Sequence, residues 1–196
     1  MKRAVCENVL NFARHPFRVP QINMDADTLH AQGANFCDAG KFSDAIAAFE
    51  QARAAVLARG DHARAVRIAN DLGVTLFRAG RTDAARKIFE ETLALAQQLG
   101  DEESEAKTTG NLALVFEKQG RLDAAEKNYR RAADLFHRIG DKQLEADTLR
   151  ALSQMELRRG RWIESLAAYD RALSVRGGAR MLRAFLQIPL RFMGIR

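Results

Sequence analysis

Residues 120–129, Gly-Arg-Leu-Asp-Ala-Ala-Glu-Lys-Asn-Tyr, contain the pattern that decides the fold. A glycine and a cation are followed by a small residue five positions after the glycine, and by an aromatic ring four positions after that. The pattern recurs every 40 residues, and its copies are Gly40-Lys41 with Ala45 and Phe49, Gly80-Arg81 with Ala85 and Phe89, Gly120-Arg121 with Ala125 and Tyr129, and Gly160-Arg161 with Ser165 and Tyr169. A fixed period held over four copies indicates a chain built from structural repeats.

Each copy predicts two helices joined by a tight turn. Glycine before a cation suits a helix end that needs left-handed dihedrals, and the Gly-Asp pairs that begin at residues 60, 100 and 140 end one helix and cap the next. A small residue seven positions before each Gly-cation turn lets the two helices approach closely, and one pair alone buries too little apolar surface, so pairs should stack into a solenoid. We expect the repeated rings Phe49, Phe89, Tyr129 and Tyr169 to be buried between helices, with Trp162 packed in the core.

These residues resemble the tetratricopeptide repeat (TPR). Gly33, Gly40, Ala45, Phe49 and Ala52 fit its pattern in the first copy, and the resemblance covers residues 25–176. Because the period is 40 rather than about 34, the chain is similar to the longer repeats of kinesin light chains, G-protein signalling modulators and bacterial peptide-sensing regulators. The resemblance implies an all-α, right-handed solenoid of four helix pairs, with repeats at about 25–61, 62–101, 102–141 and 142–176. Charge and spacing predict, outside the repeats, a basic segment at 1–24 and a basic amphipathic helix in 177–196.

In TPR solenoids the first helix of each repeat lines a concave groove, and the resemblance therefore implies where a partner would bind. The first repeat offers Asp27, His30, Ala34, Cys37 and Asp38. The site residues expected in the other repeats are Arg67, Asn70, Val74, Phe77, Arg78, Lys107, Leu114, Lys118, Arg150, Gln154, Leu157 and Arg158, beside Gly110, Glu117 and Asp147. Six cations and two acids around an apolar strip predict a peptide whose acidic residues flank apolar anchors, while solvated charges on ordinary helix faces are the alternative.

Residues 179–193 read as one more helix after Gly177-Gly178. Its polar stripe is Arg180, Arg183, Gln187 and Arg191, and the remainder is apolar, so the residues expected to contact a membrane or a partner are Arg180, Leu182, Arg183, Phe185, Leu186, Leu190, Arg191 and Phe192. A wide apolar face with arginines alone on the polar stripe is typical of a helix on an anionic membrane surface. The alternative is a helix that caps the last repeat. The stretch near Val5, Val9 and Phe12 likewise predicts either a helix on the first repeat or an interaction arm.

Composition limits the remaining function classes. The net charge is +6, but residues 1–24 carry +3 and 174–196 carry +5, so the repeats themselves are acidic at −2, and nucleic-acid binding through the tails is a weaker alternative. The two cysteines predict no disulfide framework, and we expect neither a secretory signal nor a spanning helix. No catalytic cluster, metal site or phosphate loop is recognisable, so we expect no cofactor and no enzyme. The sequence thus predicts a cytoplasmic or membrane-peripheral adaptor that binds a protein or peptide and aids assembly of a complex, with a cytoplasmic peptide-sensing regulator as the alternative.

Overall fold

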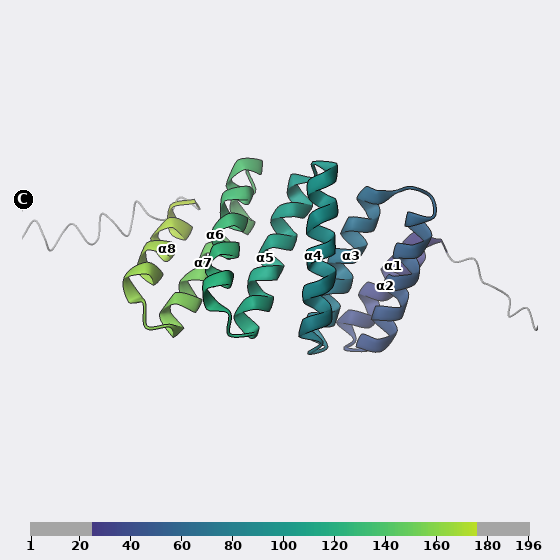
Figure 1. The fold of residues 1–196 in the computed structure, drawn as a ribbon, viewed down its shortest axis with the longest axis horizontal. Helices are drawn as coiled ribbons and strands as arrows, with labels where there is room; N and C mark the ends of the chain where they lie inside the picture. Colours follow the sequence, from purple (N-terminus) through teal and green to yellow (C-terminus); the bar gives the residue numbers. More distant parts are fainter. Residues whose placement is uncertain (1–24, 176–196) are drawn as a thin grey trace, which may run out of the picture.

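The computed structural model describes residues 25–175, which contain eight helices and no strand. The helices are α1 (Ala26–Asp38), α2 (Phe42–Leu57), α3 (His62–Arg78), α4 (Thr82–Leu99), α5 (Glu102–Lys118), α6 (Leu122–Ile139), α7 (Lys142–Arg158) and α8 (Trp162–Val175). They follow one another along the long axis of the molecule as four helix pairs (Figure 1). The predicted all-α solenoid is confirmed. The predictions for residues 1–24 and 177–196 concern residues outside the described range.

Glycine in a left-handed conformation closes every turn between helices. The glycines at residues 40, 60, 80, 100, 120, 140 and 160 have φ angles between +67° and +77°, a region that residues with a side chain rarely adopt. The Gly-Asp turns also begin the next helix, because Asp61, Asp101 and Asp141 accept hydrogen bonds from the backbone N–H three residues later, at 3.0, 3.0 and 2.9 Å. The repeated sequence therefore fixes both the end of one helix and the start of the next.

The two helices of a repeat are held together by a ring that lies on a small residue. Phe49, Phe89 and Tyr129 are buried as predicted. A Cβ atom added to Gly73 would lie 2.4 Å from Cε1 of Phe89, and one added to Gly33 would lie 2.7 Å from the Phe49 ring. Both distances are too short for real atoms, so α1 and α3 reach their partner helices only because these residues lack a side chain.

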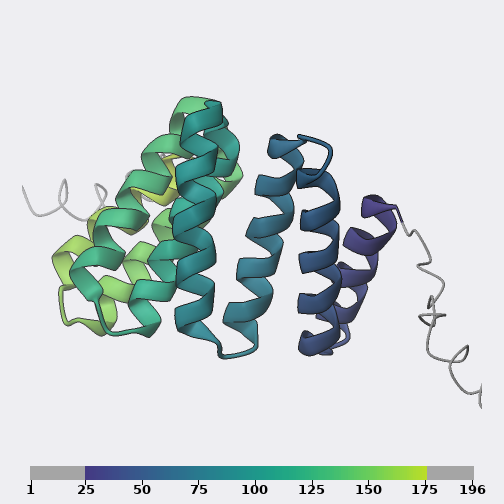
Figure 2. The ribbon, with the colours of Figure 1, turned by 45° about the vertical axis from the view of Figure 1, so that its right-hand side comes forward.

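The solenoid is curved, with the first helix of each pair on its inner side. Each helix packs mainly against its neighbours in the chain, but α1 also contacts α3, and α3 contacts α5. The second helices of successive pairs do not approach each other to this extent. Figure 2 shows the same stack turned by 45°. Because α1, α3 and α5 approach one another in this way, and α5 and α7 line two shared cavities, the first helices form the inner side of the solenoid.

One buried position breaks the repeat. Apolar residues occupy it in the first three repeats (Phe36, Leu76 and Phe116), whereas the fourth repeat has the fully buried Glu156. Arg161 Nε lies 2.7 Å from Glu156 Oε2, yet neither carboxylate oxygen has a hydrogen-bond partner among residues 25–175. Arg161 also donates to Glu126 on α6 at 2.8 Å. The junction of α6, α7 and α8 therefore contains a buried charge cluster, in which burial and the neighbouring Glu126 raise the pKa of the Glu156 carboxyl.

Two predictions about the fourth repeat are wrong. Tyr169 is 44% exposed and Trp162 is 66% exposed, although both were expected in the interior. In the earlier repeats the corresponding side of the second helix is covered by the first helix of the next pair. Within residues 25–175 no helix follows α8, so this side of α8 faces outward.

Candidate binding groove

The inner surface of α1, α3, α5 and α7, called the groove below, contains three adjoining cavities. Their volumes are about 370, 360 and 260 Å³. Leu114 and Tyr129 line both the first and the second cavity, and Asn70 and Lys107 line both the second and the third. The cavities therefore form one continuous depression across the four first helices.

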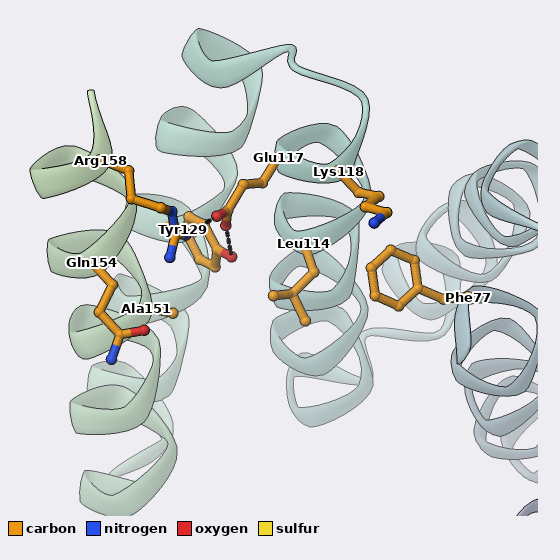
Figure 3. A pocket seen from close by; sticks show the side chains of 8 residues that line it. All are labelled: Phe77, Leu114, Glu117, Lys118, Tyr129, Ala151, Gln154 and Arg158. Atoms are coloured by element: carbon orange, nitrogen blue, oxygen red, sulfur yellow. Dashed lines mark hydrogen bonds and ion pairs between the residues drawn. The ribbon is translucent and has the colours of Figure 1, made fainter. Parts of the chain in front are cut away.

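The first cavity, between α3, α5 and α7, has an apolar floor (Figure 3). Phe77 of α3 and Leu114 of α5 lie opposite each other, and Ala151 lies across the cavity on α7. Leu114 is 41% exposed. Lys118 and Arg158 stand at the rim. This arrangement suits an apolar side chain inserted between charged groups.

A buried tyrosine fixes one wall of the same cavity. The Tyr129 hydroxyl donates to Glu117 Oε2 at 2.7 Å (Figure 3), and Arg158 forms an ion pair with the other oxygen of Glu117. Burial and the hydrogen bond to Glu117 raise the pKa of the Tyr129 hydroxyl, so it remains a donor at neutral pH. Glu117 of α5, Tyr129 of α6 and Arg158 of α7 thus join three helices in this wall of the cavity.

Two asparagine amides lie side by side in the second cavity. Asn111 Nδ2 donates to Asn70 Oδ1 at 2.9 Å, which links α5 to α3. An amide has two donor hydrogens and an acceptor oxygen. The Asn70 NH₂ and the Asn111 oxygen take no other hydrogen bond within the described part of the chain. The pair therefore leaves the NH₂ group of Asn70 as a donor and the side-chain oxygen of Asn111 as an acceptor.

The third cavity, between α1, α3 and α5, is more polar. His30 Nε2 lies 2.7 Å from Asp71 Oδ2, and the N-cap carboxylate Asp101 lies near Arg67. Although burial raises the pKa of Asp101, its hydrogen bonds to Ser104 and the charge of Arg67 hold that pKa below the usual value. Asp101 therefore stays ionised and neutralises part of the positive charge in this cavity.

Most of the predicted groove cations are neutralised by the chain itself. The ion pairs are Arg78 with Asp38, Lys107 with Glu103, Arg150 with Asp147 and Arg158 with Glu117. Arg67 and Lys118 form no ion pair with any residue of 25–175. The groove is therefore mixed in charge, and mutual repulsion of its cations does not by itself require an acidic partner.

The structure brings most of the predicted site residues together. Those that line a cavity are Arg67, Asn70, Phe77, Lys107, Leu114, Lys118, Gln154 and Arg158. Val74 is partly buried against the core, Arg150 is held by Asp147, and Leu157 is exposed but lines none of the three cavities. Arg78 lies 5.5 Å from the centre of the Phe42 ring and donates to Cys37 Sγ at 3.1 Å, so its charge is turned toward α1 and α2.

Sequence reasoning missed several residues that line the groove. Tyr129 belongs to a second helix, so the rule that first helices line the groove excluded it, although its ring reaches between α5 and α7. Asp71, Glu103 and Asn111 are one position away from, or one turn before, residues that were named. The exposed face of a helix is wider than a single line of residues. Including the positions next to the named residues would therefore have identified these side chains.

Other site classes find no support in the described residues. None of the helices within 25–175 has the length and apolar character needed to cross a membrane. Across the same residues, no group of three or more histidine, cysteine, aspartate or glutamate side chains is placed to hold a metal ion. The membrane-or-partner residues between Arg180 and Phe192 lie outside the described range.

Comparison with known families identifies the repeats. A family model described as Tetratricopeptide repeat matches residues 25–98 and 104–177. The chain belongs to the tetratricopeptide repeat family. TPR repeats are generally non-enzymatic interaction modules. No curated protein matches the chain.

Solved TPR structures share the fold at low sequence identity. A Rap protein complexed with competence and sporulation factor superposes with a TM-score of 0.71 at 17% identity, over 79% of this chain and 43% of the other. The Rap conjugation gene regulator of plasmid pLS20, in complex with the Phr* peptide, gives 0.67 at 23% identity, over 85% and 45%. A putative kinesin light chain with nearly identical TPR-like repeats, from Podosopora anserina, gives 0.61 at 14% identity, over 82% and 91%. The chain spans less than half the length of these two Rap proteins.

Proposed function

We propose that this TPR protein is a non-enzymatic adaptor that binds a segment of a partner protein in the groove and so aids assembly of a complex. The observation that carries the proposal is the apolar cavity of Phe77 and Leu114, directly beside the amide pair Asn70 and Asn111. Leu114 lines both cavities, so one ligand can occupy the two together.

The amide pair is suited to a peptide backbone. Each peptide unit carries one N–H donor and one C=O acceptor, which match the open acceptor of Asn111 and the open donors of Asn70. An apolar side chain next to that peptide unit would reach the floor formed by Phe77 and Leu114. Backbone hydrogen bonds then supply affinity, and the cavity supplies specificity.

The acidic character expected of the partner rests on two side chains. Lys118 at the rim of the first cavity and Arg67 in the third form no ion pair within 25–175, and since Asp101 offsets part of the Arg67 charge, Lys118 is the main cation available to a ligand carboxylate. We therefore propose a peptide with an apolar anchor and an acidic residue on one or both sides of it.

A peptide-sensing regulator is the second candidate. The pLS20 regulator that shares this fold was solved in complex with a peptide, which supports the proposal that this chain binds a peptide. The two candidates differ in the origin of the peptide: an adaptor binds a segment of a folded partner, whereas a regulator binds a free peptide and changes conformation.

The membrane and compartment predictions rest on sequence alone. Membrane tethering through 179–193 remains a hypothesis that liposome flotation can test. Cytoplasmic location remains an expectation, and the free, buried thiol of Cys37 is compatible with it. The exposed side of α8 favours the capping alternative for 179–193.

Peptide selection from a random phage-displayed library on the full chain tests the groove. Selected peptides should share an apolar residue flanked by acids, and binding should weaken as salt rises. Leu114→Glu should reduce affinity about 10–100-fold, because burial of an apolar side chain contributes roughly 1.5–3 kcal/mol. Lys118→Glu should weaken binding as well.

Lys127→Glu is the matched control, since Lys127 is exposed on α6 and lines none of the groove cavities. A selection that yields no consensus, or an equal loss for Lys127→Glu and Leu114→Glu, would reject the groove as the binding site.

A further inference from the structure

One glycine inside a helix has no role in bringing the repeats together. Gly110 lies in the middle of α5, where glycine is less favourable than alanine. Gly33 and Gly73 must lack a side chain, because an added Cβ would lie 2.7 and 2.4 Å from a ring. A Cβ added to Gly110 would have one close neighbour among the described residues, the Cβ of Ala132 at 3.7 Å, which is an ordinary contact. Helix packing therefore does not require glycine at this position.

The other repeats place a polar side chain where the third repeat has Gly110. At intervals of 40 residues the equivalent positions are His30, Asn70 and Arg150. Each of these three side chains forms a hydrogen bond or an ion pair. Among the four described repeats, the third alone leaves the space beside its first helix unfilled.

The space beside Gly110 belongs to the second cavity of the groove, which has a volume of about 360 Å³. Tyr129 and Phe136 of α6 and Leu144 of α7 give this cavity an apolar lining. Phe136 belongs to a hydrophobic cluster with Ala132, and Leu144 packs against that cluster, whereas Tyr129 belongs to the main core. An apolar side chain placed in the cavity would therefore contact two parts of the hydrophobic core at once.

We propose that Gly110 determines ligand specificity, because it keeps the second cavity open for a large apolar side chain of the peptide bound in the groove. This inference rests on the proposed function. It adds a second anchor to the one that Phe77 and Leu114 contact in the first cavity. A glycine that weakens its helix and yet serves binding is an exchange of stability for function.

The positions of the two cavities limit the distance between the two anchors. On α5 and on α7 alike, the residues that line the second cavity precede those that line the first by about two helical turns, or roughly 10 Å. Side chains about two to four residues apart in an extended peptide reach across this distance. Peptides selected on the full chain should therefore share two large apolar residues at such a spacing.

Filling the second cavity from either wall tests the proposal. Gly110→Leu adds a side chain from α5, and Thr148→Phe enlarges one from α7, where Thr148 lines the second cavity and neither of the others. Each change should weaken binding of a selected peptide about 10–100-fold, the loss expected when one large apolar side chain is no longer buried. Ala94→Leu is the matched control, because Ala94 is exposed on α4 and lines none of the three cavities. Far-UV circular dichroism checks that all three variants keep the helical repeats.

A change in the peptide shows whether its second anchor lies beside Gly110. Replacing this anchor by alanine should weaken binding to the wild type about 10–100-fold. The same replacement should weaken binding to Gly110→Leu by less than about 3-fold, because that variant has already lost the contact. Equal losses on the two proteins would overturn the proposal. Each loss compares two peptides on one protein, so a change in the stability of the variant does not affect it.

A small probe separates this inference from the proposed function. N-acetyl-para-fluorophenylalanine amide has one apolar ring between two peptide units, and fluorine NMR follows its binding without any selected peptide. It should bind the wild type and Ala94→Leu alike, and Gly110→Leu and Thr148→Phe about 10-fold more weakly. If this pattern holds although no library peptide binds, the proposed function fails and the cavity beside Gly110 still accepts an apolar side chain. If the probe does not bind the wild type, or binds both filled variants equally well, the proposal is overturned even where peptides bind the groove.

Discussion

Gly73→Ala tests the close approach of the two helices in the second repeat. The added Cβ would lie 2.4 Å from Phe89 Cε1 and 2.7 Å from Cζ, while Phe89 itself is buried. The ring must move, and overpacking of this kind costs about 1–3 kcal/mol. Alanine regains about 0.5–1 kcal/mol over glycine within a helix. We therefore expect a net loss of about 1–2 kcal/mol, which lowers Tm by about 2–8 °C for a domain of this size.

Gly110→Ala is the matched control. It makes the same substitution inside α5, but its nearest neighbour would be the Cβ of Ala132 at 3.7 Å, an ordinary contact. With no clash, only the helix preference acts, and the protein should gain about 0.5–1 kcal/mol. The two alanine variants should therefore change stability in opposite directions.

Urea denaturation followed by far-UV circular dichroism measures both changes, with thermal melting as a second readout. If Gly73→Ala stabilises the protein as much as Gly110→Ala does, Phe89 does not lie on Gly73 and the packing argument fails. Phe89→Leu in the Gly73→Ala background should cost less than the two single changes together, because the smaller side chain removes the clash.

Three further predictions concern the core and the helix ends. Ala125→Trp should lower stability by about 1–3 kcal/mol, because Ala125 is fully buried, and an unchanged Tm would contradict the helix-pair packing. Asp101→Ala should cost about 1 kcal/mol at pH 7 through the lost N-cap. Since the Asp101 pKa is lowered, the difference from wild type should shrink as pH falls below the ordinary value of 3.8, and a difference that is constant with pH would count against an ionised cap. Glu156→Leu should raise stability by about 1–4 kcal/mol. Because the pKa of Glu156 is raised, ionisation of this carboxyl destabilises the folded state only at pH values above its ordinary pKa of 4.5. The stability gained by Glu156→Leu, measured by urea denaturation, should therefore be larger at pH 7 than at pH 4.5. If Glu156→Leu is less stable than the wild type at pH 7, the charge cluster is net stabilising.

The fold could be predicted from the sequence because each repeat contains the glycine residues that form its turns. Gly40 and its three counterparts at 40-residue intervals end a helix in a left-handed conformation. The contact between a ring and a glycine follows from the constant spacing of Gly33 to Phe49 and of Gly73 to Phe89. The groove was predicted less completely. The direction of Arg78, turned toward Cys37 and Phe42, and the reach of Tyr129 from a second helix depend on how neighbouring repeats pack. Local spacing contains no information about those contacts.

Exposure at the end of the array was the largest error. Trp162 and Tyr169 obey the repeat pattern and still face outward in the described structure, because burial of a second helix is supplied by the next repeat rather than by its own. The repeat pattern therefore predicts burial at these positions only where another helix packs on the second helix of the repeat.

The charge cluster around Glu156 gives the solenoid a way to keep its repeats in order. Chains of similar repeats risk stacking a helix on the wrong neighbour, since apolar surfaces of equal size accept one another. In the third repeat, Arg121 lies 4.6 Å from the centre of the Phe116 ring, whereas the fourth repeat places Glu156 beside Arg161 and near Glu126. A fourth helix pair stacked on an earlier repeat would keep Arg161 beside Glu156, because both belong to that pair, but it would lose Glu126, whose place is taken by Ile46 in the first repeat and Arg86 in the second. The third and fourth repeats therefore recognise each other by charge, and an array shuffled by recombination or by design would tolerate exchange of the earlier repeats better than exchange across this junction.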